Sequence, residues 1–350
     1  MKDFPIGKKL LNKNSPALII AEVGLSHDGS LGSAHAFIDA ISKTGVDAVK
    51  FQTHIASAES SAAESFRVNV FPQDKSRYDY WERTAFSLDQ WAGLKKHADD
   101  KGILFLSTPF SLEAINLLNK IGIEAWKIGS GEVNNFIILE KLSQLKKPVI
   151  LSSGLSYLYE LDKAIDFLQR SYTPVMLMQC TSKYPCQPEY YGLNLISEFQ
   201  KRFNIPIGFS DHSGELSTNL AAVTLGAKCI EMHVIWHKEC FGPDVKASIT
   251  IDELSLLVKE VRLIERAINN PINKDIVTKD LEDMRTLFTK GLVAKKNINQ
   301  NTKLEPHHLE AIKPCLGIPA YEYHSVLGIE INKNLKKGDI IRYEDLKSQS

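Results

Sequence analysis

The sequence is poor in cysteine and has no excess of charge of either sign. Its five cysteines are odd in number and form no C-x-x-C pair, which argues against a disulfide framework and a zinc ribbon. A reducing compartment fits this usage, so we expect a cytoplasmic protein. The 42 basic residues balance the 42 acidic residues, so no overall field attracts nucleic acid or an anionic membrane surface.

Long apolar runs are also missing. The first ten residues, MKDFPIGKKL, lack the apolar segment of a signal peptide, and the most apolar N-terminal run, ALIIAEVGL, is interrupted by Glu22. We therefore expect neither a secretion signal nor a membrane-spanning helix. With 350 residues, 43% of them apolar, the chain can bury a large core and still form a second small domain.

Residues 17–267 repeat one pattern: a short apolar run, a polar or glycine-rich turn, and a segment with helical periodicity. Ser87–Gln90 and Thr250–Glu253 match capping boxes at two helix starts. Eight such units favour a (β/α)8 TIM barrel over a doubly wound sheet. The predicted strands are 17–22, 48–52, 104–108, 125–128, 149–152, 175–179, 207–210 and 229–233.

Two neighbouring predicted strands end in histidine, His212 after IGFSD and His233 after KCIEM. Adjacent strands of a parallel barrel deliver their C-terminal residues to the same rim, where two neutral imidazoles form half of a divalent-metal site. The turn Gly242-Pro243 then places Asp244 beside them. Either histidine alone is equally compatible with a capping or structural role, and it is the pairing that favours a metal site.

Two lysines at predicted strand ends, Lys50 and Lys127, follow apolar runs and would face one another across the barrel mouth. A solvated strand end explains one such lysine, whereas the pair indicates a cationic site for phosphate and carboxylate. The glycine-rich turn Lys127–Glu132 adds backbone donors ahead of a helix. The other polar residues of this rim are Glu22, Gln52, Ser107, Thr108, Ser130, Ser152, Gln179, Thr181, Ser182 and Ser210.

Two segments depart from the repeat. The connection between Gln52 and Ser87 is unusually long, which is typical of a functional loop or lid, with an oligomer contact as the alternative. After the barrel, assigned to residues 1–268, residues 269–284 are polar and read as a linker. Residues 285–350 contain two similar phrases, NINQNTKLEPHHL and NLKKGDIIRYEDL, and are assigned to a small β-rich domain.

The chain resembles the sialic acid synthase family over almost its whole length, including a C-terminal antifreeze-like (SAF) domain. The resemblance rests on the motifs IIAEVGLSHDGS, DAVKFQTH, LSTPFS, KIGSGEVNN, ILSSG, IGFSDH and FGPDVKAS. It implies condensation of phosphoenolpyruvate with an N-acylated amino hexose, usually N-acetylmannosamine, to give a nonulosonic acid and phosphate. It also implies a domain-swapped homodimer in which each SAF domain covers the partner's barrel.

Site roles follow from this resemblance residue by residue. His212 and His233 look like the metal ligands, with Mn²⁺ preferred and Mg²⁺ or Co²⁺ as alternatives. Glu22 and Asp244 match acidic residues that face the sugar, and Glu22 is expected to carry a proton. The positions that match phosphoenolpyruvate contacts are Lys50, Lys127, Ser130, Ser152 and Ser210, and those that match other site contacts are Gln52, Thr108 and Tyr184.

The departures from the family pattern lie on the sugar side. The family often has asparagine at Ser182 and histidine at Gln179, and its SAF domain commonly presents Arg-Pro-Gly-x-Gly where this chain has Lys313-Pro-Cys-Leu-Gly317. Lysine lacks the planar fork of arginine, so the sugar's identity stays open. Two other functions also stay open: a Schiff-base aldolase that uses Lys127 or Lys50, and a non-catalytic carbohydrate-binding barrel.

Overall fold

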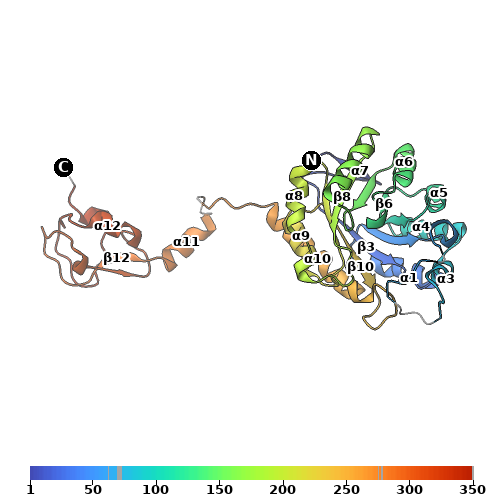
Figure 1. Ribbon diagram of the computed structural model, residues 1–350. Coiled ribbons are helices and arrows are strands. Elements are labelled where there is room, and N and C mark those ends of the chain that lie inside the picture. The colour runs from blue at the N-terminus through green and yellow to red at the C-terminus, as the bar shows by residue number, and fades with distance from the viewer. Residues whose placement is uncertain (62, 69–72, 275, 277–278, 349–350) are drawn as a thin grey trace. The chain divides into compact units, whose positions relative to one another are not determined.

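The computed structural model describes residues 1–61, 63–68, 73–274, 276 and 279–348. The chain divides into two compact units, Met1–Asn270 and Pro271–Ser350 (Figure 1). Residues 62 and 69–72 of the long predicted connection, and residues 275 and 277–278 of the predicted linker, lie outside the described part of the chain.

A parallel barrel forms the centre of the first unit. Its strands are β3 (Leu18–Gly24), β4 (Ala48–Thr53), β5 (Leu104–Pro109), β6 (Trp126–Ile128), β7 (Val149–Ser152), β8 (Val175–Cys180), β9 (Ile207–Asp211) and β10 (Cys229–Ile235). Each strand pairs with the next in the order β5-β4-β3-β10-β9-β8-β7-β6, and β5 and β6 also contact one another, so the row closes. The predicted barrel is confirmed, with strand ends displaced by at most two residues.

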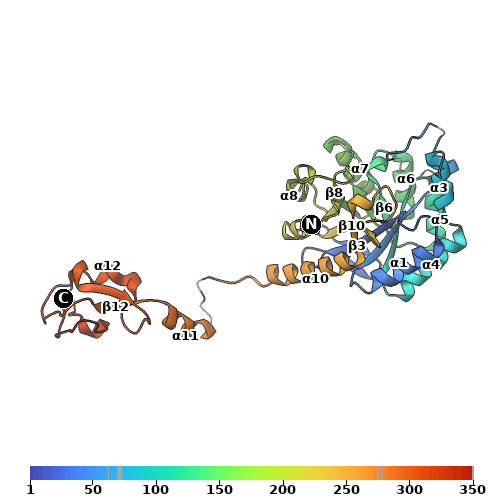
Figure 2. The ribbon, with the colours of Figure 1, turned by 90° about the horizontal axis from the view of Figure 1, so that it is seen from below.

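Helices surround the strands (Figure 2). Those of the repeating units are α1 (Leu31–Ser42), α4 (Leu88–Asp100), α5 (Leu112–Ile121), α6 (Phe136–Leu145), α7 (Leu158–Arg170), α8 (Asn194–Arg202), α9 (Ser217–Thr224) and α10 (Ile251–Ile268). The long connection adds α2 (Ala56–Glu59) and α3 (Arg77–Thr84). Both predicted capping boxes are present, Ser87 with Gln90 and Thr250 with Glu253. Within the described residues no helix combines the length and apolarity needed to cross a membrane.

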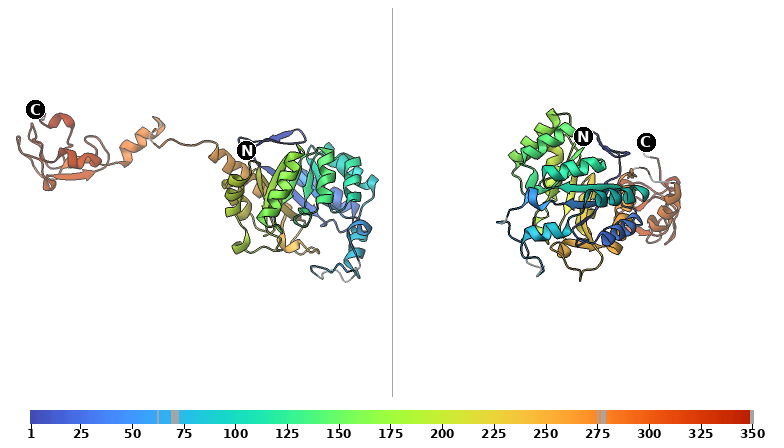
Figure 3. Two further views of the ribbon diagram at one scale, coloured as in Figure 1. Left: turned by 45° about the horizontal axis from the view of Figure 1, so that its top comes forward. Right: turned by 90° about the vertical axis from the view of Figure 1, so that its right-hand side faces the viewer.

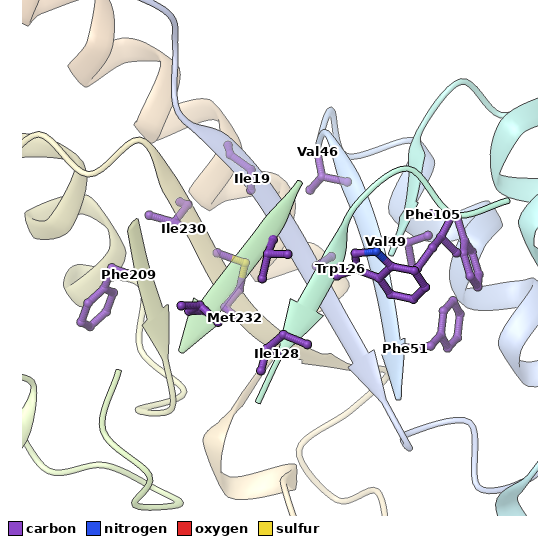
Figure 4. Close-up of a cluster of buried hydrophobic side chains, with 14 of the residues drawn as sticks. Ile19, Val46, Val49, Phe51, Phe105, Trp126, Ile128, Phe209, Ile230 and Met232 are labelled. Atoms are coloured by element: carbon purple, nitrogen blue, oxygen red, sulfur yellow. The ribbon is translucent and has the colours of Figure 1, made fainter. Parts of the chain in front are cut away.

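Side chains alternate along the strands between two apolar clusters. On β4, Val49 and Phe51 pack outward against the helices, in a cluster that also holds Phe105 and Trp126 (Figure 4). Ala48 belongs instead to the cluster inside the barrel. Because side chains of a strand alternate between its two faces, Lys50 also points inward, one layer nearer the C-terminal end. This alternation is what brings charged residues into the barrel's interior.

A short hairpin that the sequence did not reveal covers the N-terminal end of the barrel. It consists of β1 (Phe4–Ile6) and β2 (Lys9–Leu11), which pair antiparallel. Phe4, Ile6 and Leu11 join the inner apolar cluster, and the hairpin lies at the end opposite to the long connection (Figure 3, left). The barrel is therefore closed by apolar side chains at one end, and any ligand must enter at the other.

The second unit is small and has its own core. It contains α11 (Lys279–Phe288), β12 (Gly291–Ala294), β13 (Leu309–Ile312) and α12 (Tyr323–Val326), and β12 pairs antiparallel with β13. The two similar phrases meet here, because their equivalent residues Ile298 and Leu335 exchange two backbone hydrogen bonds of 2.8 Å. Helix α11 begins within the segment that was predicted to be a linker, so that segment is helical in its last part.

The hairpin predicts a stability difference between two of its own residues. Phe4→Ala removes a fully buried ring and should lower the free energy of unfolding of the barrel by about 3–5 kcal/mol. Leu10→Ala is the matched control, since Leu10 is 49% exposed, and should stay within about 0.5 kcal/mol of wild type. Urea unfolding followed by tryptophan fluorescence reports the barrel, because all 4 tryptophans lie in the first unit. Equal effects of the two changes would show that the hairpin does not seal the core.

Candidate active site

Polar side chains replace the apolar ones at the C-terminal end of the barrel interior, where they line a cavity of about 310 Å³, called here the first cavity. Most of the predicted site residues meet there. Those that line it are Glu22, Lys50, Gln52, Thr108, Lys127, Ser130, Ser152, Ser182, Tyr184, Ser210, His212 and His233. They come from all eight strands or the loops that follow them, as expected for the site-bearing rim of this fold.

Glu231 on β10 holds the two lysines of the first cavity together. Its Oε1 lies 3.1 Å from Lys127 Nζ and 3.7 Å from Lys50 Nζ, and it accepts a hydrogen bond of 3.2 Å from Ser210. Lys50 makes a second ion pair with Glu22 at 2.7 Å. All of these charged groups are buried. Two lysines and two carboxylates thus form one compensated cluster rather than an open pair of cations.

Burial and ion pairing shift the pKa values of these groups in opposite directions. Burial by itself would raise the pKa of Glu231, but Lys127 and Lys50 outweigh it and lower this pKa to about 2. Burial would likewise lower the pKa of Lys50, but the carboxylates of Glu22 and Glu231 raise it above its ordinary value. Lys50 and Glu231 are therefore both charged at neutral pH.

Glu231 was not among the predicted site residues, although the sequence holds a signal for it. Glu231 precedes His233 by two residues, so both side chains point to the same face of β10. An acidic residue in the middle of the apolar strand Cys229–Ile235 needs a buried partner. The inward-pointing lysines of β4 and β6 are that partner.

Hydroxyl groups surround Lys127 on the side of β7 and β8. Lys127 Nζ donates to Ser152 Oγ at 2.8 Å, and Ser130 Oγ accepts from the backbone N–H of Gly154 at 3.1 Å. A Cβ atom at Gly154 would lie within 2.7 Å of side-chain atoms of Ser182, Cys180 and Ser130, so any other residue there would have to displace these groups. A primary amine, hydroxyls and backbone amides in this arrangement are the donors that an anion needs.

The two histidines converge on the opposite side of the first cavity, with ring centroids 5.6 Å apart. His212 Nδ1 donates to the carbonyl oxygen of Thr181 at 2.8 Å, which fixes the tautomer, and Nε2 accepts from the Tyr184 hydroxyl at 3.0 Å. Burial and the neighbouring His233 lower the pKa of His212 to about 3. His212 is therefore neutral, and its Nε2 lone pair, which the Tyr184 hydroxyl contacts, would bind a metal ion only if that hydroxyl moved aside.

The donor set fits one part of a divalent-metal site. His233 Nδ1 is buried without a hydrogen-bond partner, and a carbonyl oxygen orients His212 as is usual for metal-binding imidazoles. Within the described residues no set of three His, Cys, Asp or Glu side chains is placed to hold a metal ion. Oxygen atoms of a ligand or of water would have to supply the remaining coordination.

A second cavity of about 180 Å³ adjoins the first and shares four lining residues with it, Gln52, Arg67, Phe110 and Tyr184. Asp244 lines this second cavity rather than the first. Its Oδ2 lies 3.9 Å from His233 Nδ1, and its carboxylate pairs with Arg67. The described residues of the long connection that line the second cavity are His54, Phe66, Arg67, Val68, Arg77, Tyr80 and Trp81. The connection thus forms a wall of the site region.

Lys313 was predicted to contact the substrate from the SAF domain. It is exposed in the second unit, with Nζ 5.4 Å from the centroid of the Phe288 ring. The residues that the structure brings together around the two cavities all belong to the first unit. A role of Lys313 in substrate binding therefore stays a prediction.

Comparison with known families identifies both units. The profile of the NeuB family matches residues 37–273, and that of the SAF domain matches residues 289–347. The first match spans more than half of the chain. The chain belongs to the NeuB family. The predicted family and the predicted C-terminal SAF domain are both confirmed.

Members of known function are similar over almost the whole chain. The N,N'-diacetyllegionaminic acid synthase of Campylobacter jejuni is 34% identical over 331 residues, 93% of this chain and 98% of that protein. The human N-acetylneuraminate-9-phosphate synthase is 32% identical and covers 94% and 92%. A crystal structure of N-acetylneuraminic acid synthetase from Leptospira borgpetersenii, in complex with citrate, has a TM-score of 0.71 at 29% identity and covers 81% and 95%.

Glu231 predicts a pH dependence of stability. Its folded-state pKa of about 2 lies below the ordinary value of 4.5, so it stabilises the fold above pH 4.5 and this contribution is lost as the pH falls toward 2. Glu231→Gln should cost about 3–5 kcal/mol at pH 7, because two buried lysines lose a partner, and the deficit should shrink in acid. The exposed Glu239→Gln is the control. Tryptophan-detected unfolding measures both variants, and a deficit independent of pH would contradict the assignment.

Proposed function

We propose that this protein is an enzyme that condenses phosphoenolpyruvate with an N-acylated amino hexose to give a sialic-acid-like nonulosonic acid and phosphate. The observation that carries the proposal is the buried pair Lys50 and Lys127, held beside two converging imidazoles at the open end of a barrel. Membership in the NeuB family and the names of the relatives support the same reaction.

The first cavity supplies the binding groups for phosphoenolpyruvate. Lys50 and Lys127 bind its carboxylate and phosphate, and the hydroxyls of Ser130, Ser152 and Ser210 turn toward the anion as donors. The carboxylates of Glu22 and Glu231 keep both amines in place before the substrate arrives. The substrate thus meets positioned cations rather than flexible surface lysines.

The reaction forms one carbon–carbon bond and consumes one water molecule. C3 of the enol attacks the aldehyde carbon of the open-chain sugar, water adds at C2, and cleavage of the carbon–oxygen bond there releases phosphate. One proton of the water passes through Glu22 to the new hydroxyl group, and the other leaves with phosphate. Glu22 is suited to this role because it is a buried carboxylate that Gln52 and Lys50 hold at the cavity wall.

His212 and His233 would hold a divalent metal, with Mn²⁺ preferred over Mg²⁺ because imidazole suits the softer ion. A bound metal of this kind polarises a carbonyl oxygen as a Lewis acid. The part of this chain in that role is to orient the imidazoles and to keep His212 neutral, which Thr181 and the buried surroundings do for His212.

The second cavity suits an uncharged acceptor sugar. Its arginines already have carboxylate partners, Arg67 with Asp244 and Arg77 with Glu64, so no free cation among its described residues awaits a sugar phosphate. Its other walls include the side chains of Leu25, Phe66, Val68, Tyr80, Trp81 and Phe110. We therefore favour an acylamino sugar with deoxy positions, such as a 2,4-diacetamido-trideoxyhexose, over N-acetylmannosamine.

The SAF domain belongs to the proposal as a cover over the barrel of a second copy in a domain-swapped homodimer. Lys313 would then stand near the acyl or distal hydroxyl groups of the sugar, with the exposed Leu316 as an apolar contact. A lysine there offers a compact charge without the planar fork of the arginine common in the family. This difference adds to the preference for a modified sugar.

The Schiff-base alternative needs a neutral lysine. The raised pKa of Lys50 and the ion pair of Lys127 with Glu231 oppose this, so borohydride with a keto acid should trap no adduct. A non-catalytic binding protein would not need to bury two lysines at considerable electrostatic cost.

Metal removal tests the role of the imidazoles. Turnover should disappear in EDTA and return with Mn²⁺, and calorimetry should show Mn²⁺ binding that His212→Ala and His233→Ala both lose while circular dichroism stays unchanged. His237→Ala is the control, since His237 is exposed in the loop after β10. Full activity in the presence of chelator would contradict a metal-assisted reaction, and loss of fold in the histidine variants would indicate a structural role.

The choice of sugar tests the proposed acceptor. Phosphate release from phosphoenolpyruvate is measured with a 2,4-diacetamido-trideoxyhexose, N-acetylmannosamine and N-acetylmannosamine 6-phosphate. We expect the first to give the highest kcat/KM, by a factor between about 10 and 10⁴, because the wrong sugar leaves buried polar groups unpaired. The proposal fails if N-acetylmannosamine or its phosphate ranks first. Lys313→Arg with an unchanged ranking would remove Lys313 as the cause of the preference.

A further inference from the structure

His54, which follows β4, connects the long connection to the reacting groups. Its buried ring lies between the rings of Trp81 and Phe110, with centroid distances of 3.7 and 4.2 Å and planes that differ by 7° and 10°. Trp81 belongs to α3 of the long connection, and Phe110 follows β5. Two nearly parallel neighbours fix the plane of the imidazole.

Both ring nitrogens of His54 face oxygen acceptors. Nδ1 lies against the carboxylate of Glu59 on α2, and these two side chains are only 5% and 8% exposed. Nε2 lies 3.3 Å from Oε1 of Gln52. Because an amide oxygen can only accept, Nε2 carries the hydrogen of this contact and holds the carbonyl end of the Gln52 amide toward the ring.

The orientation of this amide matters because its other end faces Glu22. Gln52 Nε2 donates to Glu22 Oε1 at 3.0 Å, while Glu22 Oε2 lies 2.7 Å from Lys50 Nζ. If the amide turned over, its carbonyl oxygen would face a carboxylate and a donor would be lost. The contact with His54 therefore selects the orientation in which one oxygen of Glu22 accepts from the Gln52 amide while the other forms the ion pair with Lys50.

We propose that His54 is a positioning residue that acts through Gln52 on Glu22 and so makes the geometry of the reacting carboxylate depend on the long connection. The inference rests on the proposed function for its effect on turnover, but not for its effect on Gln52. His54, Trp81 and Phe110 also line the second cavity. An acceptor bound there packs against the rings of Trp81 and Phe110, which hold His54 and, through Gln52, the carboxylate of Glu22. Acceptor binding is thereby linked to the orientation of Glu22.

His54→Phe is the central test, because phenylalanine preserves the ring stack and removes both hydrogen bonds. In crystal structures of this variant, Gln52 should leave Glu22 or occupy more than one orientation. The kcat should fall by about 100-fold, as expected for a displaced reacting group, while the KM for phosphoenolpyruvate stays close to the wild-type value. His27→Phe is the matched control, since His27 is also buried, packs against the Phe86 ring at a centroid distance of 4.7 Å and follows the adjacent strand β3, and the kcat of this variant should stay near wild type.

A double variant shows whether His54 acts through Gln52. If it does, His54→Phe added to Gln52→Leu causes no further loss of kcat, whereas independent losses that multiply would overturn the proposal. Gln52 held on Glu22 in the His54→Phe structure would overturn it as well, even if no substrate were turned over. Should His54→Phe not fold, Glu59→Ala removes the acceptor that orients the ring, and an unchanged Gln52 and kcat in that variant would also overturn the proposal.

Discussion

The buried carboxylate of Glu231 is the interaction on which the arrangement of the site depends. It neutralises Lys127 and part of Lys50, and without it two ammonium groups would repel each other inside the barrel. Glu22 completes the balance on the other side of Lys50. The two carboxylates thus hold the amines at fixed positions and balance their charge while no anionic ligand is bound. This explains how a chain with no net charge can hold a local anion site.

The charged cluster has water on one side only, because the N-terminal end of the barrel interior is closed. Apolar side chains fill the interior up to the layer of the lysines, and the N-terminal hairpin covers the bottom with Phe4, Ile6 and Leu11. Water and ligands therefore reach the charges from the C-terminal end alone, as the fold requires for a site at that rim. The long connection then adds aromatic side chains beside the opening, so the charged cluster lies on one side of the site and aromatic rings with two paired arginines lie on the other.

Most of the barrel and much of its rim could be predicted from the sequence, because strand periodicity and capping boxes are local signals. The converging residues Lys50, Lys127, His212 and His233 followed from their positions at strand ends. Glu231 was missed because its meaning depends on lysines from other strands, and the hairpin because three-residue strands have no measurable period. The stack around His54 brings together three segments of the chain, and the contact proposed for Lys313 would be made with the barrel of a second copy, so neither is a local property.

The most direct test of the account is a crystal structure of the protein with phosphoenolpyruvate and without an acceptor sugar. The account predicts an intact, noncovalently bound molecule in the first cavity, with its two anionic groups on Lys50 and Lys127 and at least one hydroxyl of Ser130, Ser152 or Ser210 in hydrogen-bonding distance. A covalent bond to either lysine, or phosphoenolpyruvate bound only outside this cavity, would contradict it.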